Sequence, residues 1–122
     1  MPLTVLAIDD SRTIRELLRE ALVQAGFEVQ LAIDGIDGLE KLALAVPDAV
    51  ITDINMPRLD GFGFIKAVRD KAEHSALPII VLTTESAAEL KARAREAGAT
   101  AWIVKPFDEA KLVSALRRVT AA

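Results

Sequence analysis

The sequence predicts an α/β protein in which a five-stranded parallel sheet lies between two layers of helices. Short apolar segments rich in β-branched residues alternate with longer segments whose apolar residues recur every three or four positions. Such strict alternation implies right-handed crossovers, which place helices on both faces of a parallel sheet as a three-layer sandwich. The chain has 122 residues, the length of one ordinary domain, so we expect residues 1–122 to form a single domain.

Four of the five predicted strands are short and almost entirely apolar, as central strands covered on both faces should be. These segments span residues 3–9, 49–53, 79–83 and 101–104. The fifth, residues 28–33, begins with polar residues that alternate with apolar ones, which is typical of a less buried strand. We therefore expect residues 28–33 to flank the sheet.

Five amphipathic segments provide the helices. The clearest follows the first strand, with Ser11 as a plausible N-cap and Gly26 as a plausible C-terminal stop. Similar patterns cover about residues 36–46, 62–72, 86–97 and 108–120. Alanine supplies most of the apolar face of the fourth helix, so that helix should bury little area and be the easiest to displace.

Composition excludes several classes of function. The chain has no cysteine, which rules out disulfides, thiolate metal sites and cysteine nucleophiles. Its formal charge of −3 gives no reason to expect direct nucleic-acid binding. No apolar run reaches the roughly 18 residues of a membrane span, and Met1 begins no signal peptide. We expect a cytoplasmic protein that binds no membrane.

Acidic residues end two of the predicted strands. Asp9 and Asp10 stand at the end of the first strand, and Asp53 ends the third. A single aspartate at such a position is most simply a helix cap or a turn residue, but ligands of open parallel sheets bind beyond the carboxyl ends of the strands. If the two strands are neighbours, the three carboxylates converge and require a neutralising cation. Oxygen ligands without histidine or cysteine suit Mg²⁺ best, which makes a magnesium site our hypothesis.

Two more polar residues end the other strands of this group. Thr83 follows the apolar run "IIVL", and Lys105 follows "AWIV". A hydroxyl and an ammonium group beside a metal-bound carboxylate cluster would provide the hydrogen bonds and the charge that a phosphoryl group requires. Asp53 is therefore our candidate nucleophile, since aspartyl phosphate is an established covalent intermediate.

The segments "AIDDS", "ITDINMPRLDGF", "LPIIVLTTES" and "AWIVKPFD" occur in the order found in one known family. Together they make the chain resemble the receiver domain of two-component response regulators, the CheY-like proteins, over essentially its whole length. The resemblance implies a flavodoxin-like fold with strand order 2-1-3-4-5.

The resemblance also implies roles for individual residues. Asp53 would accept a phosphoryl group from a histidine kinase. Asp9, Asp10 and Asp53 would hold Mg²⁺ together with the backbone carbonyl of Asn55. Asn55 lies two residues beyond Asp53, and Glu85 lies two residues beyond Thr83. Both side chains would tune the access of water to the phosphoryl group.

Further implied roles concern the last two strands. Thr83 and Lys105 would contact the bound phosphoryl group, and the Lys105–Pro106 peptide bond would be cis. Trp102 stands where the family usually has a tyrosine or phenylalanine that acts as a switch aromatic. It would move toward the space vacated when Thr83 approaches the phosphoryl group.

Other positions have simpler interpretations. Pro57 and Gly61 should shape the loop after the third strand, and Asp60 should cap the next helix. The only histidine, His74, falls in a polar loop and is expected to be a surface residue without a phosphodonor role. The basic residues of the first and the last two helices are most simply solvated helix faces.

The function implied by the resemblance is a phosphorylation switch. The protein would be a monomer that is not an enzyme, although it assists its own phosphotransfer and autodephosphorylation. Phosphorylation would change the face made by the fourth helix, fifth strand and fifth helix, and so control binding of a downstream target. The segments "HSALP" and "AWIVKPFD" most resemble chemotaxis regulators that act on the flagellar motor switch protein. A phosphorelay shuttle and a receiver detached from a larger regulator are the alternatives.

Two other classes of protein are alternatives. A flavodoxin-type carrier would share the fold, but the acidic segment "DDSRT" would repel the phosphate of FMN. An aspartyl-phosphate phosphatase of the haloacid dehalogenase type would also use an aspartate at a strand end. Those enzymes place a general acid two residues later, where this chain has Asn55.

Overall fold

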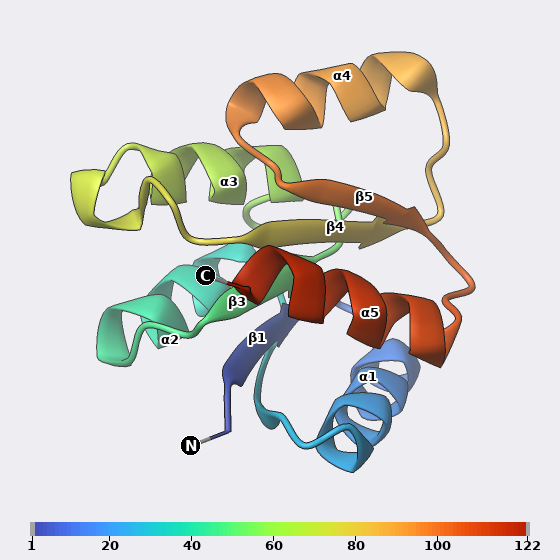
Figure 1. Cartoon of the computed structure of the whole chain (residues 1–122). Coiled ribbons are helices and arrows are strands. Elements are labelled where there is room, and N and C mark those ends of the chain that lie inside the picture. Colours follow the sequence, from blue (N-terminus) through green and yellow to red (C-terminus); the bar gives the residue numbers. More distant parts are fainter. Residues whose placement is uncertain (1, 122) are drawn as a thin grey trace.

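A computed structural model describes residues 2–121, and these form one parallel sheet with helices on both faces (Figure 1). The strands are β1 (Thr4–Ile8), β2 (Glu28–Ala32), β3 (Ala49–Thr52), β4 (Ile79–Thr83) and β5 (Ala101–Val104). Their order is β2-β1-β3-β4-β5, and every neighbouring pair is parallel. The predicted three-layer, flavodoxin-like architecture is therefore confirmed.

The helices follow the strands in strict alternation. They are α1 (Arg12–Gln24), α2 (Gly35–Leu44), α3 (Gly61–Arg69), α4 (Ala88–Ala97) and α5 (Glu109–Thr120), with a short 3₁₀ helix η1 (Ala72–His74) after α3. Figure 1 shows α1 and α5 on one side of the sheet and the other three helices on the opposite side. Among residues 2–121, no helix is long and apolar enough to span a bilayer.

The central strands supply two hydrophobic cores because their side chains alternate between the two faces of the sheet. Leu6 and Ile8 of β1 pack into the core beneath α2, α3 and α4. Val5 and Ala7 of the same strand pack into the core beneath α1 and α5. All four of these side chains are fully buried. β1 is thus buried on both faces, and the polar residues stand at the carboxyl edge of the sheet.

Side-chain caps start four of the helices. The Ser11 hydroxyl accepts a hydrogen bond from the Ile14 N–H, and the Asp60 carboxylate accepts one from the Gly63 N–H at 2.8 Å, as the sequence predicts. In contrast, the N-cap residue of α4 is Ala87, which provides no side-chain hydrogen bond. Only Ala94 of that helix is buried, which agrees with the small buried area expected for it.

The outer edge of β2 is covered by side chains from α2. The Lys41 ammonium group donates to the Leu31 carbonyl at 3.0 Å, and the Asp37 carboxylate accepts from the Ile33 N–H at 3.0 Å. Exposed strand edges invite pairing with other chains, and charged side chains protect against it. The predicted edge position of this strand is confirmed.

The apolar pattern of residues 101–104 predicts a central strand, and that prediction is wrong, whereas the strand order implied by the resemblance places this strand at the edge. β5 pairs only with β4 in the described sheet, and its four residues are half-buried or exposed. Helices cover both faces of this strand, since Trp102 packs against one core and Ile103 against the other. An apolar sequence indicates that both faces of a strand are covered. It does not indicate whether a further strand pairs with the strand's edge.

His74 is also not the surface residue that its polar loop suggests. The residue is only 6% exposed. The loop folds into η1, which turns the imidazole inward, and the backbone carbonyl of His74 accepts a hydrogen bond from Arg69 at 2.7 Å. A single 3₁₀ turn leaves too short a pattern for sequence periodicity to detect.

Candidate functional site

The three predicted acidic residues meet at the carboxyl edge of the sheet. β1 and β3 are neighbours, with Ile8 opposite Thr52, so the residues that follow them are adjacent. One carboxylate oxygen from each of Asp9, Asp10 and Asp53 lies within 4.8 Å of the others. Asp9 and Asp53 are buried, whereas Asp10 is exposed. The cluster is therefore open to solvent on the side of Asp10.

Contacts with the end of β1 and with the start of α3 hold the backbone around Asp53 in place. The Asp53 N–H donates to the Ile8 carbonyl at 3.0 Å, which continues the β1–β3 pairing by one residue. One carboxylate oxygen of Asp53 accepts from the Ile54 N–H at 2.6 Å. Gly61 packs directly against the Asp53 carbonyl, where a Cβ atom would collide with it. These contacts fix the position of the candidate nucleophile.

Lys105 joins the two buried carboxylates. Its ammonium nitrogen lies 2.7 Å from an Asp9 oxygen and 2.8 Å from an Asp53 oxygen. Burial by itself would lower the pKa of Lys105, but the hydrogen bonds with Asp53 and Asp9 outweigh it and raise the pKa above 10.5. Lys105 is therefore charged at neutral pH, and it reaches this position from the end of β5, across β4.

The pKa of the Asp9 carboxyl group is subject to opposing effects. Burial raises its pKa above the ordinary value of 3.8, although Lys105 and a hydrogen bond from the Ser11 N–H at 2.9 Å act in the opposite direction. The net shift is upward, so the charged form of Asp9 is disfavoured in the folded protein without a further cation. The Asp9 backbone carbonyl also accepts a hydrogen bond from Arg15 at 2.7 Å.

The chemistry of this donor set fits Mg²⁺. The cluster offers only oxygen ligands, its carboxylates face one another, and the one cation between them bonds to two of the three. Carboxylate oxygens with room for water are what Mg²⁺ requires. Asp9, Asp10 and Asp53 are the side chains that would hold the ion.

Three of the predicted tuning and switch residues are joined through Glu85. The Glu85 N–H donates weakly to the Thr83 hydroxyl at 3.4 Å, and its carboxylate accepts from the Asn55 amide at 3.2 Å. Its backbone carbonyl accepts from the Trp102 indole N–H at 3.1 Å. Glu85 therefore connects the mouth of the acidic site with the edge strand, a link that residue spacing could not predict.

The Lys105–Pro106 peptide bond is cis, as the resemblance implies.

Sequence reasoning missed a contact in the loop between β3 and α3, where Arg58 adopts a left-handed backbone conformation with φ of 65°. Its guanidinium group donates to both carboxylate oxygens of Asp34, at 2.6 and 3.0 Å. This hydrogen bonding holds the pKa of Asp34 below its usual range. Asp34 also caps α2, a role that the segment "DGID" could have suggested.

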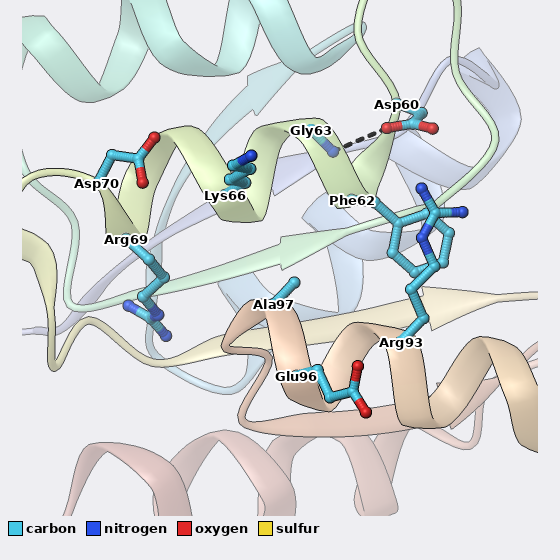
Figure 2. A pocket seen from close by; sticks show the side chains of 9 residues that line it. All are labelled: Asp60, Phe62, Gly63, Lys66, Arg69, Asp70, Arg93, Glu96 and Ala97. Atoms are coloured by element: carbon cyan, nitrogen blue, oxygen red, sulfur yellow. Dashed lines mark hydrogen bonds between the residues drawn. The ribbon is translucent and has the colours of Figure 1, made fainter.

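A cavity of about 440 Å³ lies between α3 and α4, away from the acidic cluster. Figure 2 shows its walls, with the Arg93 guanidinium group stacked over the Phe62 ring at 4.0 Å from the ring centroid. None of the three clustered carboxylates lines it. The chemistry predicted from the sequence therefore belongs to the carboxyl edge of the sheet.

Solved structures of known proteins share this fold. The chain superposes on the chemotaxis protein CheY4 of Vibrio cholerae with a TM-score of 0.93 and 44% identity, covering 98% of this chain and 99% of that one. It also superposes on the receiver domain of a sensor histidine kinase from Pseudomonas aeruginosa PAO1, with a TM-score of 0.92, 25% identity and complete coverage of both chains. That structure has a magnesium ion coordinated in its active site cleft.

Curated relatives with similar sequences are response regulators. The response regulator MprA of Mycobacterium leprae is 39% identical over 113 residues, which is 93% of this chain and 49% of the relative. The chain thus spans about half the length of the curated relatives it matches. The response regulator receiver domain matches residues 5–117. The chain therefore belongs to the response regulator receiver domain family.

Proposed function

We propose that this chain is a phosphorylation-activated switch of a two-component system in which Asp53 accepts a phosphoryl group from a histidine kinase. The observation that supports this most directly is the placement of Lys105. Its ammonium group bridges Asp9 and Asp53 at the open carboxyl edge of the sheet. A carboxylate held beside a fixed cation and two further acids is suited to accept a phosphoryl group from an anionic donor.

In the transfer step, an Asp53 carboxylate oxygen forms a bond to phosphorus as the bond from phosphorus to the histidine nitrogen breaks. The imidazole leaves with the bonding electron pair and takes up a proton. Lys105 offsets the charge on the phosphoryl oxygens, and the Ile54 N–H holds the other Asp53 oxygen in place. Mg²⁺ bound to Asp9, Asp10, Asp53 and the Asn55 carbonyl would add further neutralisation of that charge.

The switch step follows from the contacts of Thr83. Within residues 2–121, its hydroxyl accepts a single hydrogen bond, the long one from the Glu85 N–H. A phosphoryl oxygen on Asp53 offers this hydroxyl a charged acceptor, which forms a stronger hydrogen bond. Movement of Thr83 toward Asp53 would draw the Glu85 segment and, through it, Trp102. The uncapped and weakly packed α4 begins five residues beyond Thr83, so it is the element most easily displaced.

The output is binding to a target protein by a cytoplasmic monomer, without enzymatic turnover beyond its own phosphotransfer and autodephosphorylation. Similarity to the chemotaxis protein CheY4 over nearly the full length of both chains supports a chemotaxis role, with the flagellar motor switch protein as a target. The relatives that are about twice as long support the second candidate, a receiver detached from a larger regulator. A single-domain phosphorelay shuttle is the other alternative. The family assignment argues against the flavin-carrier and phosphatase alternatives.

Incubation with acetyl phosphate and Mg²⁺, followed by intact mass measurement, tests the proposal. The wild type should gain one phosphoryl group, and Asp53→Asn should gain none. Asp70→Asn, which changes an exposed acid at the end of α3, is the matched control and should behave as the wild type. An equal mass gain in Asp53→Asn would exclude this residue as the acceptor.

A further inference from the structure

The loop between β3 and α3, residues 53–60, begins at the candidate phosphoacceptor and is bound further along to the start of α2. The Gly35 N–H donates to the Leu59 carbonyl at 3.1 Å. Gly35 packs directly against that carbonyl, where a Cβ atom would collide with it. The second half of the loop therefore rests on the first residue of α2.

A bidentate ion pair reinforces this contact. The Nε and Nη2 atoms of Arg58 lie 2.6 and 3.0 Å from the two carboxylate oxygens of Asp34. The Asp34 side chain is only 3% exposed, whereas that of Arg58 is 53% exposed. Ion pairs between two exposed side chains contribute little, but a guanidinium group that bonds both oxygens of a buried carboxylate is held in one geometry. We call this pair the Arg58–Asp34 clamp.

The backbone of Arg58 also shows that this part of the loop is restrained. Its φ of 65° is the only positive value among the non-glycine residues of the range 2–121. Residues with a Cβ atom seldom adopt this conformation, and they keep it where the surrounding structure holds them. The clamp, together with the hydrogen bond to Leu59 on the next residue, provides that restraint.

Asn55 lies in the same loop, and the family resemblance implies that its backbone carbonyl is a ligand of Mg²⁺. Just before it, the Ile54 carbonyl accepts a hydrogen bond from the Gly61 N–H at 2.8 Å, which holds the start of the loop. Just after it, the clamp holds the loop at Arg58. Asn55 therefore stands between two fixed points. Mg²⁺ demands nearly ideal octahedral geometry, so the position of a carbonyl ligand matters to its affinity.

We propose that Arg58 and Asp34 are positioning residues of the metal site. Their clamp holds the β3–α3 loop in the conformation that presents the Asn55 carbonyl to Mg²⁺, although neither side chain is a ligand. Groups that orient metal ligands in this way commonly set the affinity of a site. This inference rests on the proposed function, because it concerns the Mg²⁺ that assists phosphorylation of Asp53.

The charges of the two residues, acting alone, would have a different effect from the clamp. Arg58 is a cation that repels Mg²⁺, so loss of its charge alone would tighten Mg²⁺ binding. Asp34 is an anion, so loss of its charge alone would weaken Mg²⁺ binding. The clamp requires weaker binding in both cases. Substitution of Arg58 therefore separates positioning from simple electrostatics by the sign of its effect.

Titration of the ¹⁵N-labelled chain with MgCl₂, followed by NMR, tests the proposal. Arg58→Asn keeps a residue that tolerates the left-handed backbone but is too short to form the bidentate pair. Asp34→Asn keeps an oxygen that can accept the capping hydrogen bond from the Asp37 N–H, but offers no second acceptor to Arg58.

The dissociation constant for Mg²⁺ should rise by about tenfold in each variant. The double variant should bind no more weakly than the weaker single variant, because both substitutions remove the same clamp. The matched control is Arg118→Gln, which removes the charge of an exposed arginine on α5 and should bind Mg²⁺ as the wild type does.

Unchanged or tighter Mg²⁺ binding by folded Arg58→Asn would overturn the proposal, and so would additive weakening in the double variant. Urea titration in EDTA identifies a merely structural role, which would lower the free energy of unfolding and leave the dissociation constant unchanged. Intact mass after treatment with acetyl phosphate separates this inference from the proposed function. A normal mass gain in the wild type with equal Mg²⁺ affinities in all variants removes only the clamp, whereas no mass gain in the wild type removes the phosphorylation switch itself.

Discussion

The ammonium nitrogen of Lys105 lies 2.8 Å from a carboxylate oxygen of Asp53, although 52 residues separate the two in the chain. The contact is formed because β3, β4 and β5 are neighbours and their carboxyl ends face the same edge of the sheet. A single cation thus serves two buried acids, since the same nitrogen also bonds to Asp9. The two buried acids therefore share one positive charge.

Replacement of Lys105 should therefore affect both reactivity and stability. We expect Lys105→Gln to slow phosphorylation by acetyl phosphate by about tenfold or more, because charge on the phosphoryl oxygens is no longer offset. The free energy of unfolding at pH 7 should fall by about 1–3 kcal/mol, because two acids lose their partner. The raised pKa of Lys105 means that its contribution is present below pH 10.5 and is lost as the pH rises through the raised value. Urea titration and intact mass measure the two effects, with Lys71→Gln as the control.

Asp9 should lower stability in the absence of divalent cations. Burial raises its pKa, so the folded protein binds a proton more tightly than the unfolded chain does. Its charged form then costs stability as the pH rises from 3.8 through the raised pKa. We expect Asp9→Asn to have a higher free energy of unfolding than the wild type at pH 7 in EDTA, with the difference disappearing below pH 3.8. A lower stability of Asp9→Asn at pH 7 would contradict this.

Gly61 should be required for the position of Asp53. A Cβ atom at residue 61 would collide with the Asp53 carbonyl and the Ile54 Cα, which are backbone atoms that cannot move aside cheaply. Gly61→Ala should lose about 1–3 kcal/mol of stability and react more slowly with acetyl phosphate. Gly63→Ala is the matched control, because its added methyl group would meet the end of the flexible Leu59 side chain. Equal behaviour of the two variants in urea titration and mass measurement would show that the contact at residue 61 is unimportant.

Trp102 should report activation by its fluorescence, since it is the only tryptophan in the chain. Its indole is half-buried and hydrogen-bonded to the Glu85 carbonyl, so movement of the loop that follows Thr83 changes its surroundings. We expect beryllofluoride with Mg²⁺ to shift its emission to shorter wavelength and to reduce quenching by acrylamide. Thr83→Ala should weaken both changes. Unchanged emission in a sample shown by NMR to be fully activated would remove Trp102 from the switch.

Much of the fold could be predicted because its signals are local. Alternation of apolar strands and amphipathic helices determines the layer architecture, and the caps at Ser11 and Asp60 depend on residues three positions away. The strand order needed the family resemblance, because spacing alone does not say which strands are neighbours. The edge position of β5 was misjudged for the same reason.

The buried state of His74 and the bond between Arg58 and Asp34 were missed because both depend on how a loop folds against the rest of the molecule. The sequence by itself determined the candidate site residues, since three acids, a hydroxyl and a lysine stand where the apolar runs of their strands end. Only the tertiary structure decided that Lys105 bridges Asp9 and Asp53 and that Glu85 joins Thr83 to Trp102. The physical reason is that a hydrogen bond requires two groups within about 3 Å, and sheet pairing brings distant segments to that separation.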